Sequence, residues 1–149
     1  MIMKIKKIEF YLDKNHQISL NLIKNPKKPF ISKVNALGFG KIAVDNLFFK
    51  EFSKIQQKTI IYHELWHKRN NVKFEFKILF SKNFWIFFRD NKMSKMQEFE
   101  ADKYSAIQNG KTNCLSMLKT VQKLMNKGVV DYNYKNHPTI KERISKIRG

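Results

Sequence analysis

The chain has 149 residues, a length that allows one domain with a modest hydrophobic core and leaves little room for a second. Its 42% hydrophobic content and 13 phenylalanines exclude intrinsic disorder, and its single cysteine, Cys114, excludes an internal disulfide framework. The 30 Lys and Arg residues against 12 Asp and Glu give a net charge of +18, which is typical of proteins that bind nucleic acid or an anionic surface.

The basic excess consists mainly of lysine, because only four of the 30 basic residues are arginine. Arginine is the residue that makes bidentate contacts with bases and phosphates. The lysines are also scattered along the chain rather than clustered. The composition therefore disfavours a nucleic-acid partner and leaves open a peripheral contact with a membrane or with an acidic partner.

Two short runs near the N-terminus, residues 8–12 and 18–22, alternate apolar and polar positions as half-buried strands do. The sequence Asp-Lys-Asn-His between them favours a turn, so we expect a hairpin, although the apolar residues at 2, 5, 8 and 12 also fit a helix. Two prolines place a loop over residues 25–33. The fold expected from residues 1–34 is thus a pair of strands that precedes a core at residues 35–149.

A strand followed by several helices is expected over the core. Residues 41–49 are apolar and partly β-branched and predict a strand, and Ser53 is a suitable cap for a helix over residues 53–70. Further helices are expected at residues 94–108 and 112–126, and a last one starts at Pro138. The buried positions of the last two helices are predicted as Leu115, Leu118, Val121, Leu124 and Met125, and Ile140, Ile144 and Ile147. The chain is therefore expected to be a single α+β domain in which helices predominate.

No segment of the sequence satisfies the requirements of a signal peptide or a membrane span. The N-terminus has no uninterrupted apolar region. The longest apolar-rich window, residues 78–88, is far short of the roughly 20 residues that cross a bilayer. It predicts a hairpin or cover over the preceding helix, with a membrane or protein contact as the alternative. We therefore expect a cytoplasmic protein, with attachment to a membrane surface as a further option.

Residues 63–67 read His-Glu-Leu-Trp-His inside the first predicted helix. Residues four apart lie on one face of a helix, so His63 and His67 can bind the same metal ion. Glu64 is placed to reach a water bound to that ion. The pentapeptide therefore predicts a zinc site, against the alternative of two helix histidines that arise by chance.

A catalytic zinc needs a third protein ligand. The positions three and six residues after His67 hold Asn70 and Lys73, which excludes the zinc proteases that place a third histidine there. The remaining candidates are two histidines and the carboxylates downstream of the pentapeptide: His16, His137, Glu75, Asp90, Glu98, Glu100, Asp102, Asp131 and Glu142.

Among these candidates, Glu98 and Asp102 are four residues apart and share a helix face, whereas Glu100 points in roughly the opposite direction. A helix that brings Glu98 to a metal would also bring Asp102 near a ligand histidine. There Asp102 could accept the second ring N–H of that histidine and fix its tautomer.

The order of these motifs resembles the HtpX and CAAX prenyl endopeptidase family of gluzincin metallopeptidases. HELWH at 63–67 and EFEAD at 98–102 match its HExxH and ExxxD pattern, and the segments 35–49 and 136–148 resemble its flanking elements. The resemblance implies a zincin-like fold with a small mixed sheet, an active-site helix with HExxH and a second helix with ExxxD. Familiar members carry transmembrane helices, so the chain looks closer to the minimal soluble versions, the minigluzincins.

The resemblance also implies the roles of the residues in these motifs. It assigns Zn²⁺ as the cofactor, His63, His67 and Glu98 as its ligands, and Glu64 as the catalytic base. Asp102 would contact a ligand histidine.

Three further roles follow from the resemblance alone. His137 would lie near the substrate, and Arg143 would tie the C-terminal helix to the acidic helix. The strand that precedes the active-site helix would be the sheet edge along which a peptide lies extended, through Ile42, Ala43, Val44 and Asp45.

Two functions are compatible with these features. The first is a zinc-dependent endopeptidase that hydrolyses peptide or protein substrates through a metal-activated water with Glu64 as general base. The alternative is a basic module that binds nucleic acid or anionic membrane and holds structural zinc or none. The metal motifs favour the endopeptidase.

Overall fold

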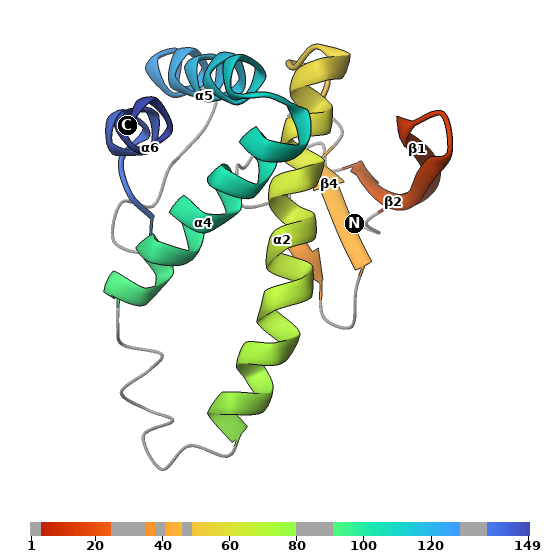
Figure 1. Cartoon of the computed structure of the whole chain (residues 1–149). Helices are drawn as coiled ribbons and strands as arrows, with labels where there is room; N and C mark the ends of the chain where they lie inside the picture. Colours follow the sequence, from red (N-terminus) through yellow and green to blue (C-terminus); the bar gives the residue numbers. More distant parts are fainter. Residues whose placement is uncertain (1–3, 25–34, 38–40, 46–48, 80–90, 129–136) are drawn as a thin grey trace.

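The computed structural model describes residues 4–24, 35–37, 41–45, 49–79, 91–128 and 137–149 (Figure 1). A small sheet lies on one side of a long central helix, and further helices lie on the other side. This arrangement agrees with a mostly helical protein that carries a small sheet. The division of the chain at residue 35 stays a prediction.

The sheet contains the predicted hairpin. Strands β1 (Lys4–Asp13) and β2 (His16–Lys24) pair antiparallel, and the Asn15 N–H donates to Asp13 Oδ1 at 2.8 Å in the turn. Phe10 and Leu20 are almost fully buried, as their alternation with polar residues predicts. The alternation therefore indicates strands rather than the helical alternative.

The strand predicted at residues 41–49 is present as β4 (Lys41–Asp45), residues 46–48 lie outside the described residues, and Phe49 is not part of a strand. Strand β4 pairs parallel with β2 and antiparallel with β3 (Asn35–Leu37), so the described strands follow the order β1-β2-β4-β3 and form a mixed sheet. The prediction that this strand is a sheet edge was wrong for Ile42 and Ala43, because both pair with β2 on one side and with β3 on the other. Val44 and Asp45 pair with β2, and their role in substrate binding stays a prediction. Among the described strands, β3 is the edge next to β4.

Helix α2 (Lys54–Leu79) begins where Ser53 predicts and extends beyond residue 70. The Gln56 N–H donates to Ser53 Oγ at 3.3 Å, and the Gln56 side chain accepts the Ser53 N–H at 3.0 Å. This reciprocal cap satisfies two N–H groups at the start of the helix. Ile78 and Leu79 thus form its last turn, and residues 80–88 of the apolar window lie outside the described residues.

Helices α4 (Asn91–Asn109) and α5 (Lys111–Asn126) are separated by Gly110, whose φ of 97° allows the sharp change of direction. In α5 the buried side chains include Cys114 and Met117, whereas Leu115 is only half-buried. The predicted buried stripe of α5 was therefore wrong at its first position, Leu115. The reason is that α5 packs against α2, α4 and α6, which buries a broader arc than one neighbour would.

Helix α6 (Ile140–Arg148) begins two residues later than Pro138. Thr139 is its cap, because the Glu142 N–H donates to Thr139 Oγ1 at 3.1 Å and the Glu142 side chain accepts the Thr139 N–H at 2.7 Å. The sequence pattern Thr-x-x-Glu is the signal for this start. The helix follows this signal rather than Pro138, because the cap satisfies two backbone N–H groups that Pro138 cannot satisfy.

Within the described ranges, no helix combines the length and the hydropathy that crossing a bilayer requires.

Candidate metal centre

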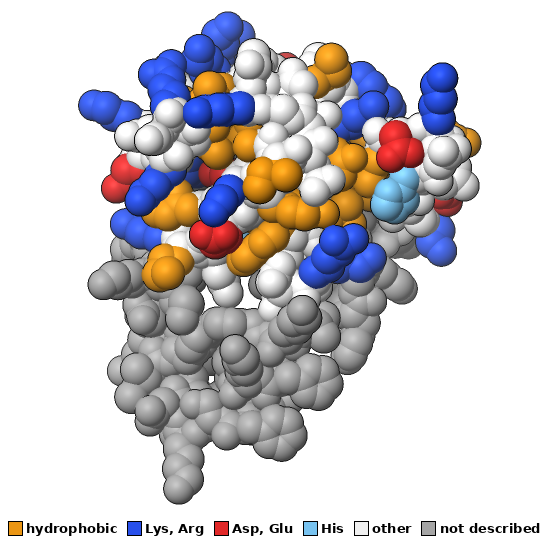
Figure 2. All heavy atoms as spheres, in the orientation of Figure 1, with side chains coloured by type: hydrophobic (Ala, Val, Ile, Leu, Met, Phe, Trp, Pro, Cys, Tyr) orange, Lys and Arg blue, Asp and Glu red, His pale blue; other side chains and the backbone are white. Residues whose placement is uncertain are grey.

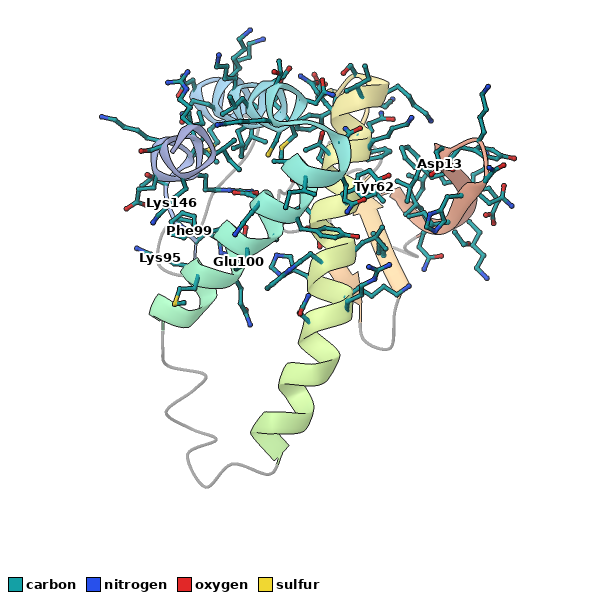
Figure 3. The ribbon with its side chains drawn as sticks, viewed as in Figure 1. Asp13, Tyr62, Lys95, Phe99, Glu100 and Lys146 are labelled. Atoms are coloured by element: carbon teal, nitrogen blue, oxygen red, sulfur yellow. The ribbon has the colours of Figure 1, made fainter. Side chains whose placement is uncertain are left out.

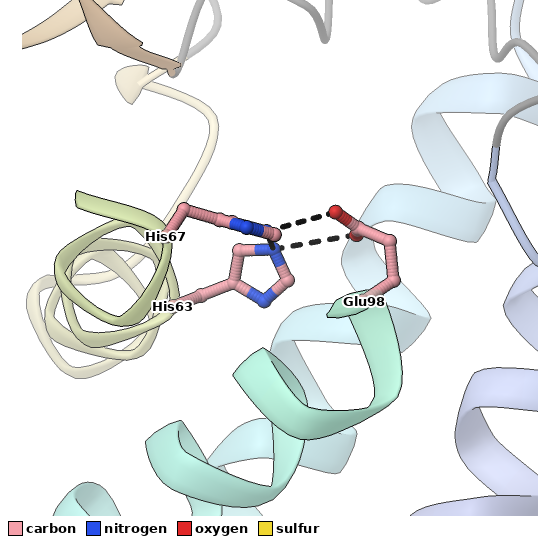
Figure 4. Close-up of side chains that lie close together, drawn as sticks. All are labelled: His63, His67 and Glu98. Atoms are coloured by element: carbon pink, nitrogen blue, oxygen red, sulfur yellow. Dashed lines mark hydrogen bonds and ion pairs between the residues drawn. The ribbon is translucent and has the colours of Figure 1, made fainter. Parts of the chain in front are cut away.

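Three potential metal ligands meet where α2 and α4 pack together (Figure 4). His63 and His67 lie one turn apart on α2, and Glu98 approaches them from α4. The Nε2 atoms of the two histidines are 3.2 Å apart. Glu98 Oε1 is 2.9 Å from His67 Nε2, and Glu98 Oε2 is 3.3 Å from His63 Nε2. The three side chains are 8%, 13% and 12% exposed, so the cluster is largely shielded from water.

The donor set fits zinc in both chemistry and spacing. Two imidazole nitrogens and a carboxylate are the ligand types of many catalytic zinc sites. In a tetrahedral site with bonds of about 2.0–2.1 Å, neighbouring ligand atoms lie about 3.3 Å apart. The 3.2 Å between the two histidine nitrogens is close to that value, and the 2.9 and 3.3 Å contacts to Glu98 are made through its two different oxygens. A cation of this size could therefore be bound after small side-chain adjustments.

Asp102 fixes the orientation of His63. The His63 Nδ1–H donates to Asp102 Oδ1 at 2.9 Å, which turns Nε2 of the same ring towards His67 and Glu98. Asp102 lies one turn after Glu98 on α4 and is only 1% exposed. The shared helix face predicted for Glu98 and Asp102 is thus observed.

Arg143 of α6 holds Asp102 in turn. Its Nε donates to Asp102 Oδ2 at 2.7 Å, and its second guanidinium nitrogen donates to Oδ1 at 2.6 Å. A third guanidinium nitrogen lies 3.7 Å from Glu98 Oε2. Both carboxylates are therefore neutralised by the same buried guanidinium.

These contacts control the ionisation of the two carboxylates. Burial alone would raise the pKa of Asp102, but the charge and hydrogen bonds of Arg143 and the bond from His63 hold it below its ordinary value. Burial likewise opposes ionisation of Glu98, whereas the charge of His63, hydrogen bonds from both histidines and Arg143 hold its pKa well below the usual range. Both groups are therefore anionic at neutral pH, as a cation site requires.

Burial shifts the pKa values of His63, His67 and Glu64, and neighbouring charges oppose or add to these shifts. Burial disfavours the charged form of His63, but Glu98 and Asp102 raise its pKa to about 10. Burial lowers the pKa of His67. Burial raises the pKa of Glu64 to about 8, with Glu98 adding to the shift and His63 and Arg143 opposing it. Without a cation, the cluster thus retains a proton on His63.

The predicted site residues are therefore distributed in three ways. The structure brings five of them into one connected cluster: His63, His67, Glu98, Asp102 and Arg143. Glu64 is buried beside this cluster on α2, and Glu100 is exposed. His137 is half-buried just before the cap of α6, and its role near a substrate stays a prediction.

Sequence reasoning missed the residues that position α4 against α2 and α5. Asn109 donates to Thr59 Oγ1 at 2.8 Å and to the Ile55 carbonyl at 2.9 Å. The Ser105 hydroxyl donates at 2.9 Å to the carbonyl of Asp102, beside the thiol of Cys114. In the sequence, the position of Asn109 before Gly110 predicted only the end of a helix. Its contact with Thr59 carries no local sequence signal because it joins residues 50 positions apart.

Comparison with known protein families matches residues 44–149 to peptidase family M48. The matched segment contains helices α2, α4, α5 and α6, and with them every residue of the cluster. No curated protein and no solved structure matches the chain.

Proposed function

The chain belongs to peptidase family M48, and from this premise we propose that it is a zinc-dependent endopeptidase of the zincin-like, gluzincin type. This is the family of the HtpX-type zinc peptidases whose motifs the sequence resembles. The observation that carries the proposal is the convergence of His63, His67 and Glu98 at one point between two helices. Peptides or proteins are the substrates that this family implies.

Each residue of the centre has a distinct role in the proposed reaction. His63, His67 and Glu98 would hold the zinc ion, which when bound polarises a peptide carbonyl and lowers the pKa of a bound water. Glu64 would take a proton from the attacking water and transfer it to the leaving amine. Its position next to His63 on α2 supports this role, because the buried carboxylate lies within electrostatic range of His63 and Glu98.

Asp102 and Arg143 would act by positioning rather than by contact with the substrate. Asp102 holds the Nδ1–H of His63, so the ring keeps the tautomer whose Nε2 can bind a metal. Arg143 holds Asp102 through two hydrogen bonds and so limits its rotation. A preorganised ligand costs less reorganisation when the metal binds.

The peptide substrate would lie along β3 rather than β4. An extended peptide adds to a sheet through free backbone groups at an edge strand. Among the described strands, β3 is at the edge next to β4, and it contacts α2, the helix with both histidines. We therefore place the substrate backbone along Asn35–Leu37.

The first experiment measures cleavage of casein by the purified, zinc-loaded protein. We expect Glu64→Gln to abolish cleavage while the zinc content stays at that of the parent. Glu51→Gln is the matched control, because Glu51 is an exposed glutamate just before the same helix. Equal activity of Glu64→Gln and the parent would exclude Glu64 as the base.

The second experiment measures zinc by elemental analysis after dialysis. Glu98→Ala should lose bound zinc, whereas Glu100→Ala, two residues away on the same helix and exposed, should retain it. Unchanged zinc in Glu98→Ala would move the third ligand to another residue. Zinc in the parent without any cleavage would favour a structural metal and the binding-module alternative.

A further inference from the structure

Helix α4 exposes a second face on the side away from the metal cluster. Glu98 and Asp102 are buried towards α2 and α6, whereas Met96 and Ile107 leave 54% and 70% of their surfaces exposed. Exposed apolar side chains grouped on one helix face are typical of interaction sites. The space-filling view shows apolar side chains among Lys and Arg side chains over this part of the molecule (Figure 2).

A groove of about 620 Å³ lies between this face of α4 and α6. Its apolar lining includes Met96, Phe99 and Ile107 of α4 and Ile147 of α6. Phe99 and Lys146 approach each other across the two helices (Figure 3), with the Lys146 ammonium 5.5 Å from the ring centre of Phe99. The groove therefore has an apolar lining and a cation over one of its aromatic rings.

The charge around the groove is strongly one-sided. Four cations line it, Lys103, Lys111, Lys146 and Arg148, against one carboxylate side chain, that of Glu100. The Lys111 ammonium donates to the Arg148 carbonyl at 3.1 Å, which joins α5 to the end of α6. Positive potential in a concave, partly apolar site attracts anionic groups.

We propose that this groove binds an amphipathic helix of a partner protein whose apolar face is flanked by Asp and Glu residues. Met96 and Ile107 are eleven residues apart, which corresponds to about 16 Å along α4, or three turns of a bound helix. The space between two packed helices accepts a third helix through apolar side chains at positions i, i+3, i+4 and i+7. The flanking acids would meet the four cations of the groove.

The hollow shape of the site favours a peptide over a lipid surface. Membrane-surface helices insert a projecting apolar face into the headgroup region. Here the apolar side chains line a depression, so an inserted side chain contacts them better than a flat bilayer does. None of the lining residues belongs to the metal cluster, so binding here can be measured in a protein whose peptidase site carries a substitution.

The test uses two designed helical peptides of fourteen residues, each carrying leucine at positions i, i+3, i+4 and i+7. One has Glu at the flanking positions and the other has Lys. Binding is measured by fluorescence anisotropy to the full chain carrying Glu64→Gln, so the peptide stays intact whether or not the protein is a peptidase. Vesicles with an anionic lipid serve as a third probe.

We expect the Glu-flanked peptide to bind, and Ile107→Glu and Lys146→Glu each to weaken its binding at least tenfold. The matched controls are Ile55→Glu and Lys14→Glu, since Ile55 is 51% exposed on α2 and Lys14 is exposed in the hairpin turn, both outside the groove. These controls should change binding less than twofold. Equal binding of the Lys-flanked peptide, equal loss in groove and control variants, or groove-dependent binding of vesicles alone would overturn the proposal.

Discussion

Replacing Arg143 by methionine tests whether the cluster depends on the buried ion pair behind it. Methionine fills much of the same space but removes both hydrogen bonds to Asp102, which is only 1% exposed and cannot be hydrated in their place. Loss of one partner of a buried ion pair costs about 3–5 kcal/mol. His63 still donates to Asp102, so we expect the lower part of this range, about 3 kcal/mol.

The free energy of unfolding is measured with urea in the presence of EDTA, so that metal binding does not contribute. A loss of about 3 kcal/mol corresponds to a fall in Tm of about 6–12 °C for a chain of this size. Lys141→Met is the control, because Lys141 is exposed on the same helix. It should change stability by less than about 0.5 kcal/mol.

The contribution of the Asp102 carboxylate to stability decreases as the pH falls. The pKa of Asp102 lies below its ordinary value of 3.8 in the folded protein, so its contribution to stability is present above that value and is lost as the pH falls through the lowered pKa. In Arg143→Met the Asp102 carboxylate keeps only the hydrogen bond from His63, so it protonates more readily. The difference in stability between parent and variant should therefore be largest at neutral pH and shrink below about pH 4.

A double-mutant cycle decides between an ion pair and simple packing. Adding Asp102→Asn to Arg143→Met removes the unpaired charge, so the double variant should be more stable than the sum of the two single losses predicts. The reasoning is refuted if Arg143→Met stays within about 1 kcal/mol of the parent, or if the two losses are simply additive.

Three further predictions concern the cap, the thiol and the metal-free cluster. Thr139→Ala should cost about 1 kcal/mol by urea unfolding because the Glu142 N–H loses its acceptor, whereas Thr139→Ser should retain stability. Cys114 should not react with a thiol reagent until the chain unfolds, since it is fully buried and burial raises the pKa of its thiol to about 11; rapid labelling of the folded protein would contradict this. Zinc binding at pH 7 should release a proton, because the carboxylates keep the pKa of His63 at about 10 despite its burial, and the zinc affinity should therefore rise with pH. Calorimetry in buffers of different ionisation enthalpy measures the number of protons released. Equal apparent binding enthalpies in these buffers would exclude the release.

Features encoded within a few residues were predictable from the sequence. The hairpin follows from alternation on either side of a four-residue turn, and α2 begins at Ser53 because its cap is local. The spacing of Glu98 and Asp102 on one helix face predicted that the two would approach the histidine helix together, whereas the assignment of Glu98 as the ligand came from the family resemblance. The assignment of Arg143 came from the family resemblance, since the sequence alone gives no signal for a contact between residues 41 positions apart.

The wrong predictions concern features decided by neighbours. Residues 42–45 contain an ordinary strand pattern, but whether that strand is interior depends on β3, a strand of only three residues and too short to show alternation. The start of the buried stripe in α5 depends on which three helices pack around it. In α6, two local signals predict different first residues of the helix, and the structure follows the cap at Thr139 rather than Pro138.

The link between Arg143 and Asp102 also sets an order of events during synthesis on the ribosome. His63, His67 and Glu98 all precede Arg143 in the chain, and Asp102 precedes it by 41 residues. At about 5–20 residues per second, Asp102 is synthesised about 2–8 s before the guanidinium that neutralises it, and the three ligands precede Asp102. During that interval α6 cannot dock, and the carboxylate that orients His63 has no buried cation. The nascent chain therefore carries all its metal ligands before it can hold them in place, which delays a competent centre until the C-terminal helix has been made.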